Sequence, residues 1–285
     1  MLELSPTLKK HVDPAAPIPL RMMAAKALVP LPPPDMITAL FLLTSDTDEK
    51  VRATAMESAG KLPDRILSSG LRDEEVNPPV LGWFLDQLAR QDVYAEMLVL
   101  NASTPDEAVA RAASICGMRT AEIIAQNQLR LLRHEDVVRQ LCLNPNCGPA
   151  LIDGVCDFCV RSGLVMADVP QMKASRVRIY GPQAAEAPPD PGPTADEVIE
   201  EFGELGDENA PPLEEGKRLT LAQRIMKMSI AEKIKLATKG NKEARSYLLR
   251  DSNKLVSVAV IRSPKITDGE VLAVANNRAA QDDVL

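Results

Sequence analysis

The fold is decided by residues 92–110, which read DVYAEMLVLNASTPDEAVA, and by the similar residues 253–273, which read NKLVSVAVIRSPKITDGEVLA. Each stretch has an apolar helical segment, a short polar turn containing Ser or Thr and Pro, and an acidic residue that opens a second helical segment. Helices this short cannot bury their apolar side chains alone, so we expect neighbouring pairs to stack. The repetition predicts a helical-repeat fold, with a non-repetitive helical domain as the alternative.

The same pattern continues toward the amino terminus, where Pro, Asp and Asn separate short apolar segments. Proline and N-capping side chains of this kind mark the points at which one helix ends and the next begins. We therefore expect helices over residues 19–29, 35–43, 48–59, 63–71, 78–88, 93–100, 105–116 and 120–132.

The composition agrees with an all-α fold. The chain has 285 residues but only one Trp, three Tyr and four Phe, so its core must be aliphatic. A core of Leu, Ala, Val, Ile and Met favours packed helices over an aromatic-rich β-sandwich.

Residues 249–275, which read LRDSNKLVSVAVIRSPKITDGEVLAVA, resemble the helical repeats of the leucine-rich-repeat-variant and HEAT-like group. The resemblance extends over residues 19–143 and 219–285. It implies an α-solenoid, in which a helix, a Pro-containing turn and a second helix stack into a curved, right-handed superhelix. Many proteins of this group are scaffolds, so the resemblance implies a fold and not an activity.

Four of the five cysteines are clustered, with the spacing Cys142-x4-Cys147-x8-Cys156-x2-Cys159. A structural zinc site needs four ligands, and a Cys-x2-Cys pair lets one turn present two thiolates. The cluster resembles a zinc ribbon, although a ribbon would usually carry a cysteine where Asn144 stands. We expect these four cysteines to bind a structural zinc ion. An iron–sulfur cluster and free or redox-active thiols are the alternatives.

The surroundings of the cluster suggest a small knuckle. Gly148 and Gly154 permit tight turns, and residues 150–152 are expected to form a short strand between them. Residues 175–180 alternate polar and apolar side chains and are expected to form a second strand.

Two further candidate side chains lie before the cluster. His134 could replace one cysteine as a ligand, but the Glu135-Asp136 pair after it indicates a helix start, which favours a surface or capping role. Cys116 stands alone in an Ala-rich segment, so we expect it to be a small buried residue.

An acidic segment follows the knuckle. Residues 183–216 contain eleven Asp and Glu and no Lys or Arg, together with many Pro, so we expect a disordered linker. Within it, residues 195–205 place Val198, Ile199 and Phe202 on one side of a possible amphipathic helix. This helix is either a docking motif or an incidental patch in a spacer.

The carboxy-terminal part is basic, with fourteen Lys and Arg against seven Asp and Glu in residues 217–285. Ser229 and Glu232 form a capping-box pattern, and Gly240 ends the helix that they open. The basic side chains are expected either to form a solvated face or to bind anions such as nucleic acid. The candidates are Lys227, Lys233, Lys235, Lys239 and Lys242.

These features predict four parts. They are a helical-repeat domain at 1–141, a zinc knuckle at 142–180, an acidic linker at 181–216 and a basic helical-repeat module at 217–285.

The functional prediction is a non-enzymatic protein-interaction scaffold or adaptor. The sequence has no G-x-S-x-G, Walker, Rossmann or H-E-x-x-H motif, and only two histidines. We expect a cytoplasmic protein with no membrane insertion, which binds protein partners and self-associates through its carboxy-terminal repeats. The alternative is a nucleic-acid-associated regulator that uses the knuckle and the basic module, although the net charge of −7 disfavours general phosphate binding.

Overall fold

The computed structural model describes residues 4–185, 192–202, 215–264 and 266–275. Within these ranges the chain forms nineteen α-helices and a short 3-10 helix but no β-strand, which confirms the all-α prediction. The chain divides into two compact units: the first contains residues 1–124 and 143–147, and the second contains residues 125–142 and 148–285.

The helices of the first unit and of the junction are α1 (Pro6–Val12), α2 (Ile18–Ala25), α3 (Pro33–Leu43), α4 (Glu49–Ala59), α5 (Asp64–Arg72), α6 (Pro78–Leu88), α7 (Asp92–Leu100), α8 (Asp106–Ala113) and α9 (Met118–Gln126). They are followed by α10 (Gln128–Arg133), α11 (Glu135–Leu143), α12 (Pro149–Arg161), α13 (Pro170–Tyr180), the 3-10 helix η1 (Pro182–Ala185), α14 (Ala195–Phe202), α15 (Glu215–Lys227), α16 (Ile230–Lys239), α17 (Lys242–Leu248), α18 (Lys254–Ile261) and α19 (Asp268–Ala275).

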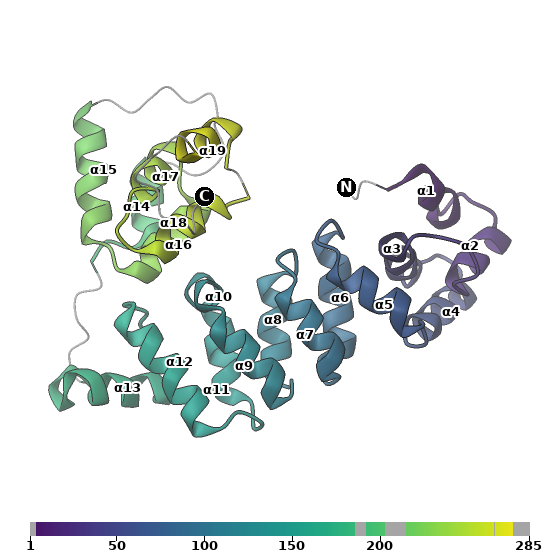
Figure 1. Ribbon diagram of the computed structural model, residues 1–285, viewed down its shortest axis with the longest axis horizontal. Coiled ribbons are helices and arrows are strands. Elements are labelled where there is room, and N and C mark those ends of the chain that lie inside the picture. The colour runs from purple at the N-terminus through teal and green to yellow at the C-terminus, as the bar shows by residue number, and fades with distance from the viewer. Residues whose placement is uncertain (1–3, 186–191, 203–214, 265, 276–285) are drawn as a thin grey trace. The chain divides into compact units, whose positions relative to one another are not determined.

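The first unit has two layers of short helices. The odd-numbered helices α1, α3, α5 and α7 pack side by side in succession, while α2 packs on α4 and α6 packs on α8 (Figure 1). The core between the layers is mainly Leu, Ala and Val, as the composition predicts. At the edge of this core, the half-buried rings of Phe41 and Trp83 and the buried ring of Phe84 are in contact. The ring centroids of Phe41 and Trp83 are 6.1 Å apart, and those of Trp83 and Phe84 are 4.8 Å apart.

Six of the joints between paired helices share one turn. In each, an Asp or Asn side chain at the end of the first helix accepts a hydrogen bond from the backbone N–H two residues later, which is an Asx turn. The N–H to Oδ1 distances are 2.8–2.9 Å. The six residues are Asp13, Asp46, Asp73, Asn101, Asn144 and Asp251. The same local turn therefore recurs between helices along the chain.

Two of these joints also bind the end of an earlier helix. The Asn101 side-chain amide donates to the carbonyl oxygens of Leu71 and Asp73 at 2.9 and 3.0 Å. The Asn144 amide donates in the same way to the carbonyls of Ala113 and Cys116 at 2.8 and 3.0 Å. Because all four carbonyls lie at the ends of earlier helices, each Asn closes its own turn and satisfies the end of another helix.

The predicted helix over 120–132 is wrong in one respect, because it is broken. Helix α9 ends at Gln126, and Asn127 accepts a hydrogen bond from the Arg130 N–H and caps the separate helix α10. Asn is a poor residue for a helix interior and a strong N-cap, so the side chain starts a new helix here.

The turn at Asp46 carries a buried ion pair with Arg21, whose Nε–H also donates to the Ala16 carbonyl at 3.0 Å. Burial by itself would raise the pKa of the Asp46 carboxyl. The hydrogen bonds from Arg21 and from the Asp48 N–H outweigh that effect, so the pKa lies below its ordinary value of 3.8. The ionised form of Asp46 is therefore the one that the fold stabilises.

This lowered pKa predicts acid sensitivity of the first unit. A carboxyl whose pKa is lower in the folded state contributes stability above its unfolded pKa and loses it as the pH falls through the folded pKa. The difference in unfolding free energy between the wild type and Asp46→Asn should be constant from pH 7 to about pH 5 and should shrink below about pH 4. Urea titration monitored by Trp83 fluorescence measures it, and a difference that is constant down to pH 2.5 would contradict the assignment.

In the second unit, α16 lies at the centre and contacts α10, α14, α17 and α18 (Figure 1). The predicted start and end of this helix are confirmed, since Ser229 accepts from the Glu232 N–H at its beginning and Gly240 stands at its end. The Glu232 carboxylate does not return to Ser229 as a full capping box would; it accepts from the Ala195 N–H at 2.8 Å.

The acidic segment expected to be a disordered linker contains a packed helix. Helix α14 buries Ala195, Val198 and Ile199, which are 1, 1 and 8% exposed, and contacts α15 and α16. The docking interpretation of residues 195–205 is therefore supported within this chain for residues 195–202. The rest of that motif, 203–205, and residues 186–191 and 206–214 of the predicted linker lie outside the described residues.

Polar contacts hold α14 at both ends. At its carboxyl end, the Asn241 side-chain amide donates to the Phe202 carbonyl at 2.7 Å, and Arg224 pairs with Glu201 at 2.8 Å. The acidic helix α14 is thus held by a basic and an amide side chain of the module that follows it.

Candidate functional site

The predicted metal ligands Cys156 and Cys159 lie in a helix and not in a knuckle. Helix α12 begins at Pro149 after Gly148, and it includes residues 150–152, which were expected to form a strand. Residues 175–180, the second expected strand, lie in α13. Both strand predictions are wrong. Each helix has a Pro at its first position, which favours a helix start, and α12 also has apolar side chains at helical spacing.

Cys142 and Cys156 come together within the second unit. Their Sγ atoms are 3.8 Å apart, and Cys159 lies one helical turn after Cys156, with both α12 cysteines fully buried. The hydrogen bond to Cys156 lowers the pKa of the Cys142 thiol, although burial opposes the shift. The pKa of the Cys156 thiol is raised, mainly by the same contact and to a lesser extent by burial. Burial raises the pKa of the Cys159 thiol to about 12.

Cys147 belongs to the first unit, where Asn144 holds the 143–147 segment on the end of α8. Cys147 acts electrostatically on Cys116, which is fully buried as predicted. The pKa of the Cys116 thiol is raised to about 12, mainly by burial and to a lesser extent by the charge of Cys147. His134 ends α10 directly before α11 begins, in agreement with its predicted position at a helix boundary.

The structure therefore brings two of the four predicted ligands into contact, and the described part of the chain has no group of three or more His, Cys, Asp or Glu side chains arranged for a metal ion. This arrangement does not match a four-thiolate zinc site. Zinc binding by Cys142, Cys147, Cys156 and Cys159 stays a prediction of the sequence.

Metal analysis tests that prediction directly. Protein purified without added metal should contain about one zinc ion per chain, and a chelator should lower its melting temperature, if the four cysteines form a structural site. Protein that contains no metal and melts at the same temperature with and without chelator would contradict it.

A different candidate site lies on α7 in the first unit. Val93, Met97 and Leu100 follow one another at helical spacing on its outer side, and Val93 and Leu100 are 64 and 68% exposed. Together with side chains from α5 and α9 they line an open groove of about 500 Å³. We call this the α7 groove; its lining residues are Arg72, Glu74, Val93, Glu96, Met97, Leu100, Asn101 and Arg119.

The elements around the α7 groove are fixed by polar contacts. Arg119 of α9 pairs with Glu96 of α7 at 2.8 Å, and the Thr120 hydroxyl donates to Asp92 at 3.1 Å. Asn101, at the base of the groove, joins the end of α7 to the end of α5. The apolar stripe therefore lies on a braced surface with charged side chains of both signs at its edges.

Sequence reasoning did not identify this groove, although a signal was present. Helix α7 reads DVYAEMLVL and buries Ala95, Leu98 and Val99 on its inner side. The remaining Val, Met and Leu exceed what one buried face requires, and a short helix that is apolar on two sides has a second surface to cover.

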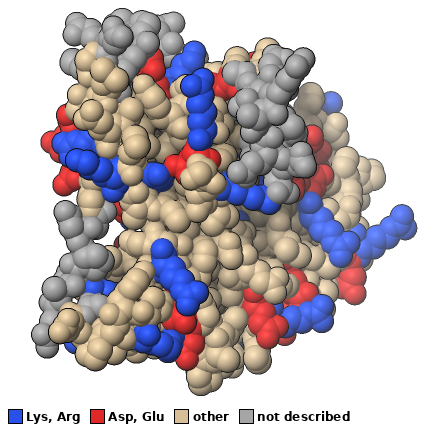
Figure 2. Space-filling view, turned by 60° about the vertical axis from the view of Figure 1, so that its left-hand side comes forward, with Lys and Arg blue, Asp and Glu red and all other residues tan. Residues whose placement is uncertain are grey.

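The basic side chains of the carboxy-terminal module are largely matched by acidic ones. Lys233 pairs with Asp251 at 2.7 Å, Lys235 pairs with Glu232 at 3.0 Å, and Lys239 lies 4.0 Å from Asp196 of the acidic helix. On the face drawn in Figure 2, Lys and Arg are interspersed with Asp and Glu. This distribution gives little support to a phosphate-binding surface on that face.

Comparisons of the chain with models of protein families, with curated proteins and with solved structures found no match. Among the described helices, none is both long and apolar enough to cross a bilayer.

Proposed function

We propose that the chain is a non-enzymatic protein-interaction scaffold built from HEAT-like helical repeats that stack as a right-handed solenoid. The observation that carries this proposal is the exposed apolar stripe of the α7 groove. Most apolar residues of its helix neighbours are buried, yet Val93 and Leu100 are about two-thirds exposed. Contiguous exposed apolar surface on a braced element is typical of a binding surface.

The shape and chemistry of the groove favour an amphipathic helix of a partner protein. Val93, Met97 and Leu100 form a straight stripe along α7, which can receive apolar side chains spaced three and four residues apart on a second helix. Arg72 and Glu74 stand at one edge of the groove, so the partner helix would carry charged side chains of both signs beside its apolar face. Binding of a partner helix in this groove requires no catalytic side chains, so it is consistent with a scaffold function.

The nucleic-acid alternative has less support. Three of the five lysines proposed for a positive face have acidic partners, and the sequence between Cys142 and Cys159 contains no Lys or Arg. Self-association through the carboxy-terminal repeats also stays part of the proposal.

Charge placed on the stripe tests the proposal. Leu100→Asp should abolish co-purification of the bound protein from cells of the source organism, because a desolvated carboxylate in an apolar interface costs several kcal/mol. Met56→Asp is the matched control, since Met56 is an exposed apolar residue of α4, outside the groove, and 47% exposed. Equal recovery of the same proteins by both variants would contradict the assignment of the groove.

A further inference from the structure

Two thiols of the second unit are already in contact. Cys142 lies in the last turn of α11 and Cys156 lies in α12, fourteen positions later in the sequence, and their Sγ atoms are 3.8 Å apart. A disulfide has an S–S distance of about 2.05 Å, so the two sulfurs need to approach each other by about 1.8 Å. Rotation about χ1 moves a sulfur without moving its helix, so a local change can bring the pair within bonding distance.

The two cysteines differ in their access to solvent. Cys142 is half-buried, whereas Cys156 is fully buried behind it, as is Cys159 one helical turn later. A small oxidant that arrives from solvent therefore meets Cys142 first and finds a second thiol directly against it. An accessible thiol beside a second thiol that can resolve its oxidised form is the organisation of a redox-active cysteine pair.

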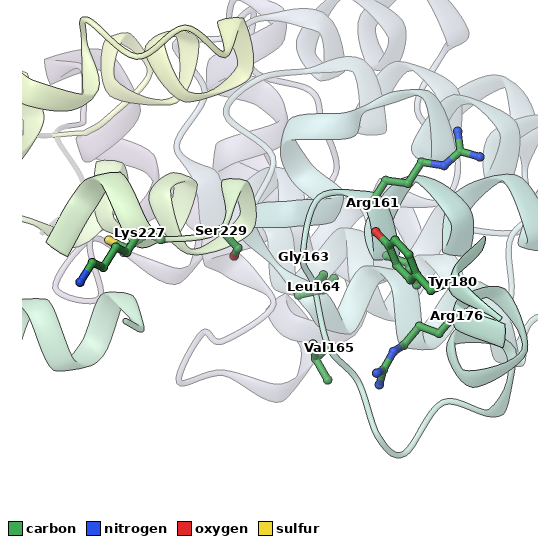
Figure 3. Close-up of a pocket in the computed structure, with 10 residues that line it drawn as sticks. Arg161, Gly163, Leu164, Val165, Arg176, Tyr180, Lys227 and Ser229 are labelled. Carbon is green, nitrogen blue, oxygen red and sulfur yellow. The ribbon is translucent and has the colours of Figure 1, made fainter. Parts of the chain in front are cut away.

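Helix α12, which carries the buried partner, is braced by its neighbours. The Asp157 carboxylate, next to Cys156, pairs with Arg178 of α13 at 2.6 Å. In the turn after α12, a Cβ built on Gly163 would lie 2.5 Å from the Ser229 Cβ. Figure 3 shows Gly163 and Ser229 at a pocket of about 250 Å³ that both residues line. Because α12 is held in this way, we expect the movement that forms the bond to come from Cys142 at the end of α11.

We propose that Cys142 and Cys156 form a reversible disulfide, with hydrogen peroxide as the oxidant. The Cys142 Sγ attacks one peroxide oxygen, the O–O bond breaks, and the leaving hydroxide takes the thiol proton to give water and a sulfenic acid on Cys142. The Cys156 Sγ then attacks the Cys142 Sγ, the S–O bond breaks, and the leaving hydroxide takes the Cys156 proton to give a second water. Two thiols are thus oxidised to one disulfide, and one peroxide is reduced to two waters.

The disulfide would close residues 142–156 into a loop that joins the end of α11 to the middle of α12. This loop includes Asn144, which closes its own turn and donates to the Ala113 and Cys116 carbonyls. Oxidation would therefore restrict the chain around that joint. The inference is independent of the α7 groove and of the scaffold proposal. It is an alternative to the four-thiolate zinc site, because both use the same two sulfurs.

Peptide mapping after mild oxidation tests the proposal. The folded full chain is treated with hydrogen peroxide, its remaining thiols are blocked with N-ethylmaleimide in denaturant, and it is cut with an endoproteinase that cleaves before Asp. This cleavage places Cys142 in peptide 136–152 and Cys156 in peptide 153–156, and it places Cys159 in a third peptide. The expected product is a covalent link between the first two peptides, which dithiothreitol releases.

Four variants assign the link. Cys147→Ser should keep it, because Cys147 shares peptide 136–152 with Cys142 but lies in the first unit. Cys159→Ala should also keep it, and Cys142→Ser should abolish it. Cys156→Ala should abolish it too, and Cys142 should instead gain two oxygen atoms as a sulfinic acid that dithiothreitol does not reverse, because the resolving thiol is gone.

The map of the wild-type chain decides the pairing of the three peptides by itself, so the proposal stays testable if a variant does not fold. It is overturned if peroxide produces no link between peptides 136–152 and 153–156, or if peptide 136–152 links to the Cys159 peptide instead. It is also overturned if Cys142→Ser forms the same link as the wild type.

Discussion

Glu270→Ala should lower the unfolding free energy of the second unit by about 3–5 kcal/mol, because it leaves the buried guanidinium of Arg245 without its partner. Arg245 and Glu270 form a two-point pair at 2.9 and 3.0 Å, and their side chains are 4 and 6% exposed. Burial opposes ionisation of Glu270, but hydrogen bonds from Arg245 and Thr267 outweigh it and lower the pKa of the carboxyl. The pair joins α17 to α19.

Hydrogen exchange of the α17 amides measures this loss. Glu201→Ala is the matched control, because Glu201 forms an Arg–Glu pair with Arg224 in which both side chains are about 40% exposed. Exposed pairs contribute about 1 kcal/mol or less, so the control should change protection little. The double substitution Arg245→Met with Glu270→Met should recover part of the loss, since it removes both buried charges. Equal effects of Glu270→Ala and Glu201→Ala would contradict a stabilising role of the buried Arg245–Glu270 pair.

Asn101→Ala should lower the unfolding free energy of the first unit by about 2–4 kcal/mol, because each buried polar group left without a partner costs about 1–3 kcal/mol. The substitution removes the donor to two carbonyl oxygens, those of Leu71 and Asp73, and it removes the acceptor of the Ser103 N–H. Urea titration monitored by Trp83, the only Trp of the chain and part of α6, reports the change.

Two variants separate the hydrogen bonds from loss of volume. Asn101→Asp keeps the size and the Asx turn but points a carboxylate oxygen at two carbonyls, so it should destabilise the unit at neutral pH at least as much as alanine does. Ser103→Ala removes one exposed hydrogen bond to the Glu74 carbonyl and should cost less than about 1 kcal/mol. If Asn101→Asp is as stable as the wild type, the amide does not join the end of α7 to the end of α5.

Much of the fold could be predicted from the sequence, because the signals for helix ends are local. The predicted helix over 78–88 is confirmed to the residue, and Asp48 caps α4 as expected. The Asx turns could also have been found, since an Asp or Asn stands four to six residues before a Pro in several joints, as at Asn101 and Asn144. These are short-range interactions, and the sequence contains all their participants.

The cysteine cluster shows why other features could not be predicted. Ile152, Val155, Cys156 and Cys159 have the spacing of one helical face, and all four are buried. Because free cysteine packs like a small apolar side chain, the same residues fit a helix core and a metal site equally well by pattern alone. Only the surrounding structure distinguishes the two, and here it places these side chains in the apolar face of α12.

The α7 groove could not be located from the sequence, because exposure depends on which neighbours cover a helix. Val93 and Leu100 are of the same types as the buried Val99 and Leu98 in the same helix. Their difference in burial arises from the packing of α5 and α6 against α7, which no local pattern specifies.

Site-specific photo-crosslinking in the native cell is the most direct test of the scaffold proposal. A benzoylphenylalanine in place of Leu100 should form a covalent adduct with one defined protein, and the same group in place of Val93 should capture the same protein, because both side chains line the α7 groove. The same group in place of Met56, exposed on α4, should not capture it. No adduct at positions 93 and 100, or the same set of adducts at all three positions, would contradict the proposal.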